Sequence, residues 1–199
     1  TDGITSFGAS QNSIAVGADA TYGNVNFSGR NYVDYFFRRA PGFFDEVCYT
    51  GTGALLTVNH NLGVVPELVI NKSRSTTFGW YVTYNFTSTT YDTIVLNTDA
   101  ANSTASYGTG AVFYSSRPTA TTLPFATNAT INTSGQTQVA YLFATCPGVS
   151  KVGSYTGTGA TQTVDCGFTG GARFVMIKRT DSTGDWYVWD TARGMVSGT

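Results

Sequence analysis

Few residues in this sequence are suited to chemistry, and His60 comes first because it is the only histidine. A Ser-His-Asp or Cys-His mechanism would have to use it as the base. It stands in the stretch Asn-His-Asn-Leu-Gly, where an imidazole can hydrogen-bond to nearby backbone. A metal site there lacks clustered partners, because asparagines flank the histidine. We therefore predict that His60 is a turn residue, neither a catalytic base nor a metal ligand.

Carboxylates are the second group, because two of them can together hydrolyse a glycosidic bond. Asp45 and Glu46 are adjacent, so on a strand their side chains point to opposite faces. We expect Asp190 to pair with Arg193. We expect Asp181 to hydrogen-bond within the turn at residues 181–184. The aspartates around this turn are Asp181, Asp185 and Asp190. We predict no catalytic residue, no cofactor, no metal and no enzymatic activity.

Aromatic side chains form the third group, in the runs Trp80-Tyr81 and Trp186-Tyr187-Val188-Trp189. Exposed aromatic faces beside polar groups suit sugar rings, but such residues equally suit core packing or a contact between units. Both alternatives stay open. The residues assigned to glycan or subunit contact are Trp80, Tyr81, Trp186, Tyr187, Trp189, Asp185 and Asp190.

The composition excludes several partners. Only 12% of the residues are charged, the formal net charge is −1, and the densest cationic spot is Arg38-Arg39. Non-specific nucleic-acid binding rests on clustered Lys and Arg, so we predict no nucleic-acid partner. No stretch approaches the length of a transmembrane helix, so we predict no membrane insertion. The length of 199 residues suits one or two domains.

Three cysteines, Cys48, Cys146 and Cys166, are present. An odd number at irregular spacing is neither a disulfide framework nor a zinc signature. We expect three small, partly buried hydrophobic residues. One bridge between Cys146 and Cys166 is the alternative.

An internal repeat organises the chain. The hexapeptide Tyr-Thr-Gly-Thr-Gly-Ala occurs at residues 49–54 and again at 155–160. Sliding the chain by 106 positions aligns residues 23–83 with residues 129–189 without a gap and with 22 identities in 61 positions. Chance would give roughly one in thirteen, and self-similarity at a fixed period indicates a repeat. We therefore predict the end of a preceding unit at residues 1–22, a first unit at 23–128 and a second, truncated unit at 129–199.

The residues kept in both copies are framework residues. Val33, Tyr35 and Phe37 match Val139, Tyr141 and Phe143, and this period of two is typical of one strand face. The Thr-Gly-Thr-Gly motif follows one strand-like run and precedes another, so it is expected to connect a hairpin. Residues kept in the turns of both copies are Asn26/Asn132, Ser28/Ser134, Gly29/Gly135, Pro41/Pro147 and Gly42/Gly148.

Many short strands with regular turns predict an all-β fold, with antiparallel β-sandwich or jelly-roll-like units in tandem. The clearest hairpin spans residues 174–190 and turns at 181–184. At most one helical turn is expected, at residues 98–106. The predicted strands are 13–16, 33–38, 46–49, 55–59, 67–72, 80–84, 93–97, 111–114, 138–143, 152–155, 161–166, 173–178 and 186–189.

The stretch from residue 135 to 194 resembles a repeat domain of tail and tail-fibre proteins of tailed bacteriophages, especially marine and cyanobacterial ones. The first copy carries the His-x-Leu-Gly-x-x-Pro-x-x-Val pattern typical of such proteins, at His60, Leu62, Gly63, Pro66 and Val69. The second copy departs from this pattern, with Cys166, Phe168, Thr169 and Ala172 at the first four of these positions. This departure argues against a shared catalytic role for His60.

The resemblance implies a structural protein of the virion, an extracellular particle, that takes part in host attachment. The implied partners are other copies of the chain, other tail proteins and a host-surface glycan or protein. A homotrimer is the form that fibres often take, although the sequence itself does not show it. A secreted carbohydrate-binding module or microbial surface adhesin is the alternative function.

Overall fold

The structure is a computed structural model that describes residues 4–7, 13–17 and 25–194. The described residues form twelve β-strands, one 3-10 turn and no α-helix, so the predicted all-β class is confirmed. By its contacts the chain divides into two units, residues 1–36 and 37–199. The repeat boundaries predicted at 22/23 and 128/129 stay a prediction.

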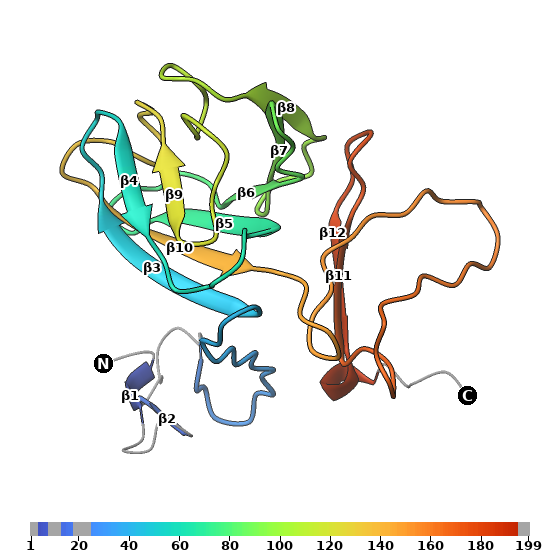
Figure 1. The fold of residues 1–199 in the computed structure, drawn as a ribbon. Helices are drawn as coiled ribbons and strands as arrows, with labels where there is room; N and C mark the ends of the chain where they lie inside the picture. Colours follow the sequence, from blue (N-terminus) through green and yellow to red (C-terminus); the bar gives the residue numbers. More distant parts are fainter. Residues whose placement is uncertain (1–3, 8–12, 18–24, 195–199) are drawn as a thin grey trace. The chain divides into compact units, whose positions relative to one another are not determined.

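A six-stranded antiparallel sheet forms most of the second unit, as Figure 1 shows. Two of its inner strands, β10 and β5, have neighbours on both sides, so their backbone N–H and C=O groups are paired along both edges. In spatial order the strands are β3 (Phe44–Thr50), β10 (Thr137–Phe143), β5 (Leu68–Ser73), β6 (Tyr81–Tyr84), β7 (Thr90–Val95) and β8 (Ser103–Ser106).

The core lies between this sheet and a two-stranded sheet of β4 (Leu56–Asn59) and β9 (Thr122–Phe125). Alternate residues of β5 and β10, among them Val69 and Leu142, point into it and are fully buried. Phe125 of β9 stacks on Tyr114 with ring centroids 5.4 Å apart. The arrangement is sandwich-like, with the short sheet lying across one face of the long one (Figure 1).

The N-terminal unit contains one short antiparallel pair, β1 (Ile4–Phe7) and β2 (Ile14–Val16). Further along, the N–H of Arg30 donates to the carbonyl of Phe27 at 3.3 Å and closes a turn. Gly29 in this turn has a φ of 74°, a conformation that side chains with a Cβ rarely adopt. Residues 31–36, which follow the turn, form no strand.

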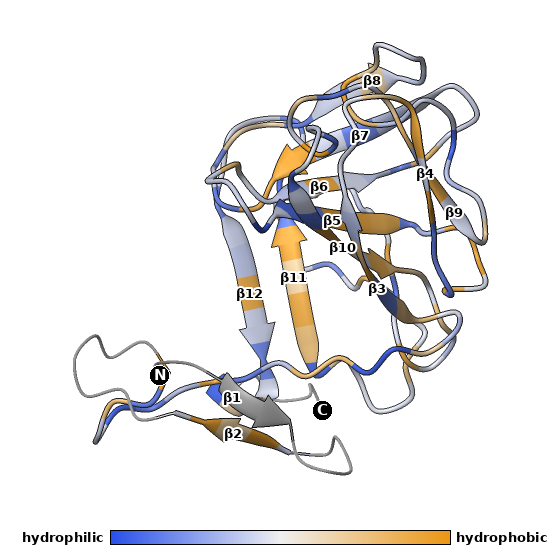
Figure 2. Cartoon of the chain, turned by 90° about the vertical axis from the view of Figure 1, so that its left-hand side faces the viewer, coloured by the Kyte–Doolittle hydropathy of each residue, from blue (hydrophilic) through white to orange (hydrophobic). Residues whose placement is uncertain are grey.

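The C-terminal part carries the hairpin of β11 (Phe174–Lys178) and β12 (Trp186–Asp190), which was predicted and is confirmed. A 3-10 turn, η1 (Thr191–Arg193), follows it. Figure 2 shows β11 as one of the most hydrophobic strands of the chain. Between Ser150 and β11, residues 151–173 form a long loop without strands (Figure 1).

Several predicted elements are wrong. No strand forms at the predicted positions 33–38, 111–114, 152–155 and 161–166. Among the described residues these runs have no neighbouring strand to pair with, and the one pairing is an isolated bridge between Tyr114 and Phe125. The helical turn predicted at 98–106 is replaced by β8. The first Thr-Gly-Thr-Gly motif does not connect a hairpin, because β3 pairs with β10 while β4 pairs with β9. The motif instead leads from one sheet to the other.

Local geometry recurs at the spacing of the sequence repeat. The turn glycines Gly42 and Gly148 have φ values of 75° and 74°. In each recurring pair, the same backbone or side-chain atoms bond in both copies. These pairs are Phe27–Arg30 with Thr133–Gln136, Ala40–Phe44 with Cys146–Ser150, and Thr52–Ala54 with Thr158–Ala160.

The two hairpins β5–β6 and β11–β12 also share their register. Leu68 lies opposite Tyr84, and Phe174, which stands 106 positions after Leu68, lies opposite Asp190. Every further pair of the β5–β6 ladder has its counterpart in β11–β12 at the same spacing. Pairing register decides which side chains share a face, so the two hairpins present equivalent positions to equivalent faces.

Candidate functional site

His60 follows β4 and is buried, with 4% of its surface exposed. Its Nδ1 accepts a hydrogen bond from the N–H of Leu62, and its Nε2 lies 3.2 Å from the carbonyl oxygen of Thr119. Because Nδ1 accepts, the ring is neutral and its proton sits on Nε2. Burial lowers the pKa of His60 and outweighs the opposite effects of Thr119 and Asp45. The predicted turn role is confirmed: the imidazole ties two loops together.

Asp45 is the buried carboxylate of β3, while Glu46 beside it is exposed, so their predicted placement on opposite faces is confirmed. The Oδ1 of Asp45 accepts a hydrogen bond from Nε of Arg39 at 2.5 Å, and the Oδ2 of Asp45 accepts one from the N–H of Asn61 at 2.7 Å. Burial alone would raise the pKa of Asp45, but these hydrogen bonds outweigh it and the pKa is lowered. Asp45 therefore anchors the loop that carries His60.

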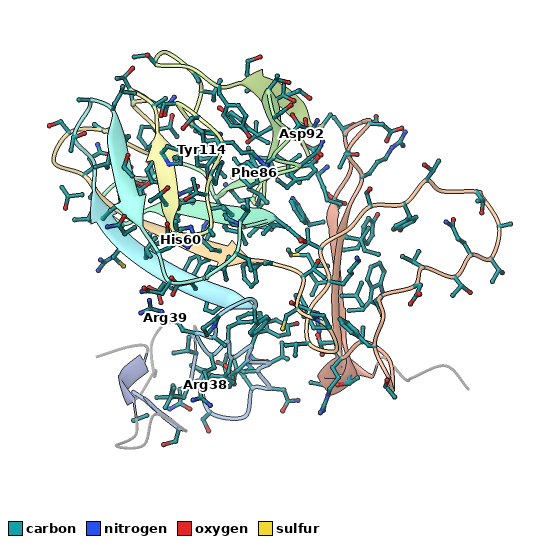
Figure 3. All side chains as sticks on the ribbon, viewed as in Figure 1. Arg38, Arg39, His60, Phe86, Asp92 and Tyr114 are labelled. Atoms are coloured by element: carbon teal, nitrogen blue, oxygen red, sulfur yellow. The ribbon has the colours of Figure 1, made fainter. Side chains whose placement is uncertain are left out.

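A polar cluster around Asp92 was missed by the sequence analysis. Asp92 of β7 accepts hydrogen bonds from Nδ2 of Asn85 at 2.7 Å and from Oγ1 of Thr104 at 2.5 Å. Burial alone would raise its pKa, but these bonds and one from Asn102 lower it. The partners come from different strands and loops, so no motif in the sequence joins them. His60 and Asp92 lie in separate parts of the unit (Figure 3).

The aromatic candidates of the first copy are Tyr81, the first residue of β6, and Trp80, which precedes it. Tyr81 packs against Phe113 in the core, with ring centroids 5.1 Å apart. Trp80 stacks on Tyr141 of β10 at 6.4 Å. Neither residue is among the exposed large hydrophobic side chains. Both side chains therefore pack on other rings of the unit, as the core alternative expects.

The aromatic candidates on β12 differ. Tyr187 and Trp189 are 54% and 45% exposed and stack on each other with ring centroids 5.7 Å apart. The indole Nε1 of Trp186 instead donates to the carbonyl of Val95 at 3.0 Å. Because the two hairpins share their register, Tyr187 corresponds to Tyr81 and Trp189 corresponds to Thr83. Tyr81 packs against the core and Thr83 is fully buried, whereas their counterparts on β12 are exposed.

Of the aspartates near β12, Asp190 is buried and accepts from Nε of Arg193 at 2.6 Å, so the predicted pair is confirmed. It also caps the 3-10 turn. Asp185 is exposed on the turn. Asp181 pairs with Arg179 at 2.7 Å on the surface. Asp185 is thus an exposed carboxylate two residues before Tyr187 in the sequence.

No cluster of three or more His, Cys, Asp or Glu side chains within the described ranges could hold a metal ion. The cysteines, all described, are free, and Cys48 is exposed. No described helix is long and apolar enough to cross a bilayer.

A further polar site joins the first Thr-Gly-Thr-Gly motif to the turn before β10. Asn132 is fully buried; its Oδ1 accepts from the N–H of Thr52 at 2.9 Å, and its Nδ2 donates to the carbonyl of Ala54 at 2.6 Å. The N–H of Gly135 donates to the backbone carbonyl of Gly51, and the N–H of Gly53 donates to the backbone carbonyl of Asn132. We call this set of bonds the turn junction.

Residues 1–198 match a family model described as a domain of unknown function, DUF7483. The chain belongs to this family. No curated protein and no solved structure matches the chain. The DUF7483 match covers both copies of the sequence repeat, so the turn junction and the β11–β12 hairpin lie within one family domain.

Proposed function

We propose that this chain is a structural, non-catalytic protein of a bacteriophage particle, a tail fibre or other tail-associated component, that attaches to host-surface glycans. One observation carries the proposal: His60 and Asp45, two side chains able to do chemistry, hold loops in place. Both ring nitrogens of His60 meet backbone groups, and Asp45 is bonded to Arg39 and Asn61. The resemblance of residues 135–194 to phage tail repeats points to the particle.

The second copy supports the same proposal. Cys166 stands at the position of His60, and Lys151 stands at the position of Asp45. An active site would need both groups wherever it recurs, whereas a scaffold needs only its turns and strand faces. The turn geometry recurs while these residues change.

The surface chemistry suits glycan contact. The net charge of −1 and the 12% of charged residues favour hydrogen bonding to polar surfaces over strong electrostatic attraction. In this proposal the described residues that meet the sugar are Tyr187, Trp189 and Asp185. Several copies on one particle would convert weak contacts into avidity.

The proposal is tested on purified particles of the source phage. Mass spectrometry should detect peptides of this chain, and electron microscopy with a labelled antibody should place them on the tail. Detection only in the lysate, with none in particles, would contradict the virion role. Binding to host cells should fall in Tyr187→Ala and Trp189→Ala particles and stay unchanged in a Tyr155→Ala control, which alters another exposed aromatic residue.

A secreted carbohydrate-binding module is the second candidate, and the stacked pair of Tyr187 and Trp189 favours it. A glycan array with the isolated chain separates the two. Tight, saturable binding by the isolated monomer supports the module, while binding seen only with assembled particles supports the fibre. Release of reducing ends from capsule, abolished by Asp185→Ala or Asp190→Ala, would overturn the non-catalytic assignment.

A further inference from the structure

A glutamine side chain lies in the core of the sandwich-like body without a protein partner. Gln138, the second residue of β10, is fully buried, and within the described part of the chain neither its Oε1 nor its Nε2 meets a hydrogen-bonding group. The Oε1 of Gln136, two residues earlier, is likewise buried and unbonded among these residues. Buried polar groups without hydrogen bonds cost free energy, so native proteins satisfy them with protein groups or with ordered water.

Gln138 points into the core, where polar side chains surround it. Residues of β10 alternate between the two faces of the sheet, and Ala140 and Leu142, which share the face of Gln138, belong to the hydrophobic core. Directly opposite Gln138 lie Tyr49 of β3 and Ser73 of β5. Tyr49 packs against the same core, and Ser73 is buried. The carboxamide of Gln138 is therefore close to groups that can share a bound molecule with it.

The nearest polar groups are bonded only loosely. Asn71 of β5 is buried and lies diagonally across from Gln138. Its Nδ2 donates to the hydroxyl of Tyr49 and its Oδ1 accepts from the hydroxyl of Tyr114, each at 3.5 Å. Hydrogen bonds of these types are usually about 2.7–3.0 Å long, so both contacts are at the long limit. The hydroxyl of Tyr49, which donates to the carbonyl of Ile131 at 2.7 Å, can still accept a bond.

We propose that the side chains of Gln138, Asn71 and Tyr49 bind ordered water, at least one molecule, inside the core of this body. We call these three side chains the amide site. The water bonds the carboxamide of Gln138 and links it to Asn71 and Tyr49, whose own contacts leave bonding capacity. An internal water typically makes about three hydrogen bonds to such buried groups.

The chemistry of the amide site favours water over an ion or an organic molecule. Burial raises the pKa of Tyr49 and that of Tyr114 beside Asn71, so both hydroxyls keep their protons and the groups are neutral. An ion there would lose its hydration without meeting an opposite charge. Because Asn71 already contacts Tyr49 and Tyr114, a larger ligand would have to displace them. Water both donates and accepts, which matches the two ends of a carboxamide.

The amide site lies where β10 enters the sheet, three residues after Gly135 of the turn junction. Water bound there connects β10 to both of its neighbours, β3 and β5. A slip of β10 by one residue would turn Gln138 to the opposite face and remove it from the site. The amide site therefore favours the observed register of β10. This inference does not depend on the phage assignment.

Magnetic relaxation dispersion of the water oxygen nucleus, which detects water held inside a protein, tests the site in the full chain. The dispersion amplitude should fall by at least one water molecule in Gln138→Met, because methionine has a similar length and no amide. Gln162→Met makes the same change at an exposed glutamine of the loop 151–173 and should leave the amplitude unchanged. Equal amplitudes in the unchanged chain and in Gln138→Met overturn the proposal.

The sign of the stability change is the second readout. If water bonds Gln138, then Gln138→Met removes those bonds and should lower the melting temperature by roughly a few degrees. If the carboxamide were unbonded, the same substitution would remove a buried unpaired amide and raise the melting temperature. A raised melting temperature therefore contradicts the proposal.

A crystal structure of the unchanged chain decides the case in which Gln138→Met fails to fold. Water density at hydrogen-bond distance from the carboxamide of Gln138 supports the proposal. A carboxamide that bonds protein groups directly, with no water beside it, overturns it.

Discussion

Residues 44–146 and residues 150–194 share the internal sequence similarity, but of the two only the first stretch forms a sandwich-like body. Both contain the Thr-Gly-Thr-Gly motif and a hairpin of the same register. In the first, β10 fills the gap between β3 and β5, and the core behind it is buried. In the second, the hairpin forms while the stretches corresponding to β3 and β4 stay as loops. A local hairpin forms without the closing strand, whereas the rest of the body needs it.

The largest contrast between the copies is expected at the paired positions 142 and 36. Leu142→Ala removes a fully buried side chain and should lower the free energy of unfolding by about 2–5 kcal/mol. Phe36→Ala, in dilute monomer, should change it by less than about 0.5 kcal/mol, because Phe36 is exposed. Urea unfolding followed by tryptophan fluorescence measures both. Equal losses would show that the two copies are equally folded.

The next contrast lies at the paired glycines of the repeated motif. Gly51→Ala forces a Cβ against the backbone of Thr133 and should cost about 1–3 kcal/mol. Gly157→Ala meets no atom within 4 Å and should be close to neutral in the monomer. Thermal unfolding of the two variants, side by side, is the measurement. A destabilising Gly157→Ala in dilute monomer would mean that the second motif is already packed.

The smallest expected effect is a pH dependence of the stability, which His60 contributes and its counterpart Cys166 does not. Burial lowers the pKa of His60 below its ordinary 6.5, so the unfolded chain takes up a proton before the folded one. The stability contribution is therefore complete above about pH 6.5 and is lost as the pH falls below it. Asp45, whose pKa is also lowered, loses its contribution only below its ordinary 3.8.

The melting temperature should accordingly fall by roughly a few degrees between pH 7 and pH 5. In His60→Gln this part of the slope should disappear, while Cys166→Ser should keep it. A slope that persists in His60→Gln would assign the effect to other groups.

Alternating residue patterns were sufficient to predict the β11–β12 hairpin and the placement of Asp45 and Glu46 on opposite faces, and the stretch Asn-His-Asn-Leu-Gly was sufficient to predict the turn role of His60. The same pattern failed at residues 33–38, although it matches β10 position by position. Alternation describes what a segment can do in a sheet, and the presence of two neighbouring strands decides whether it does so. β9 was missed because Pro124 interrupts its pattern, and the Asp92 cluster was missed because its partners are brought together only by folding.

Hydrogen–deuterium exchange tests most directly whether the first copy alone forms a closed sheet at the positions of β3. β3, β5 and β10 should exchange slowly, because their main-chain groups are paired in the six-stranded sheet, and residues 150–173 should exchange fast. Protection of residues 150–156 equal to that of β3 would contradict the account.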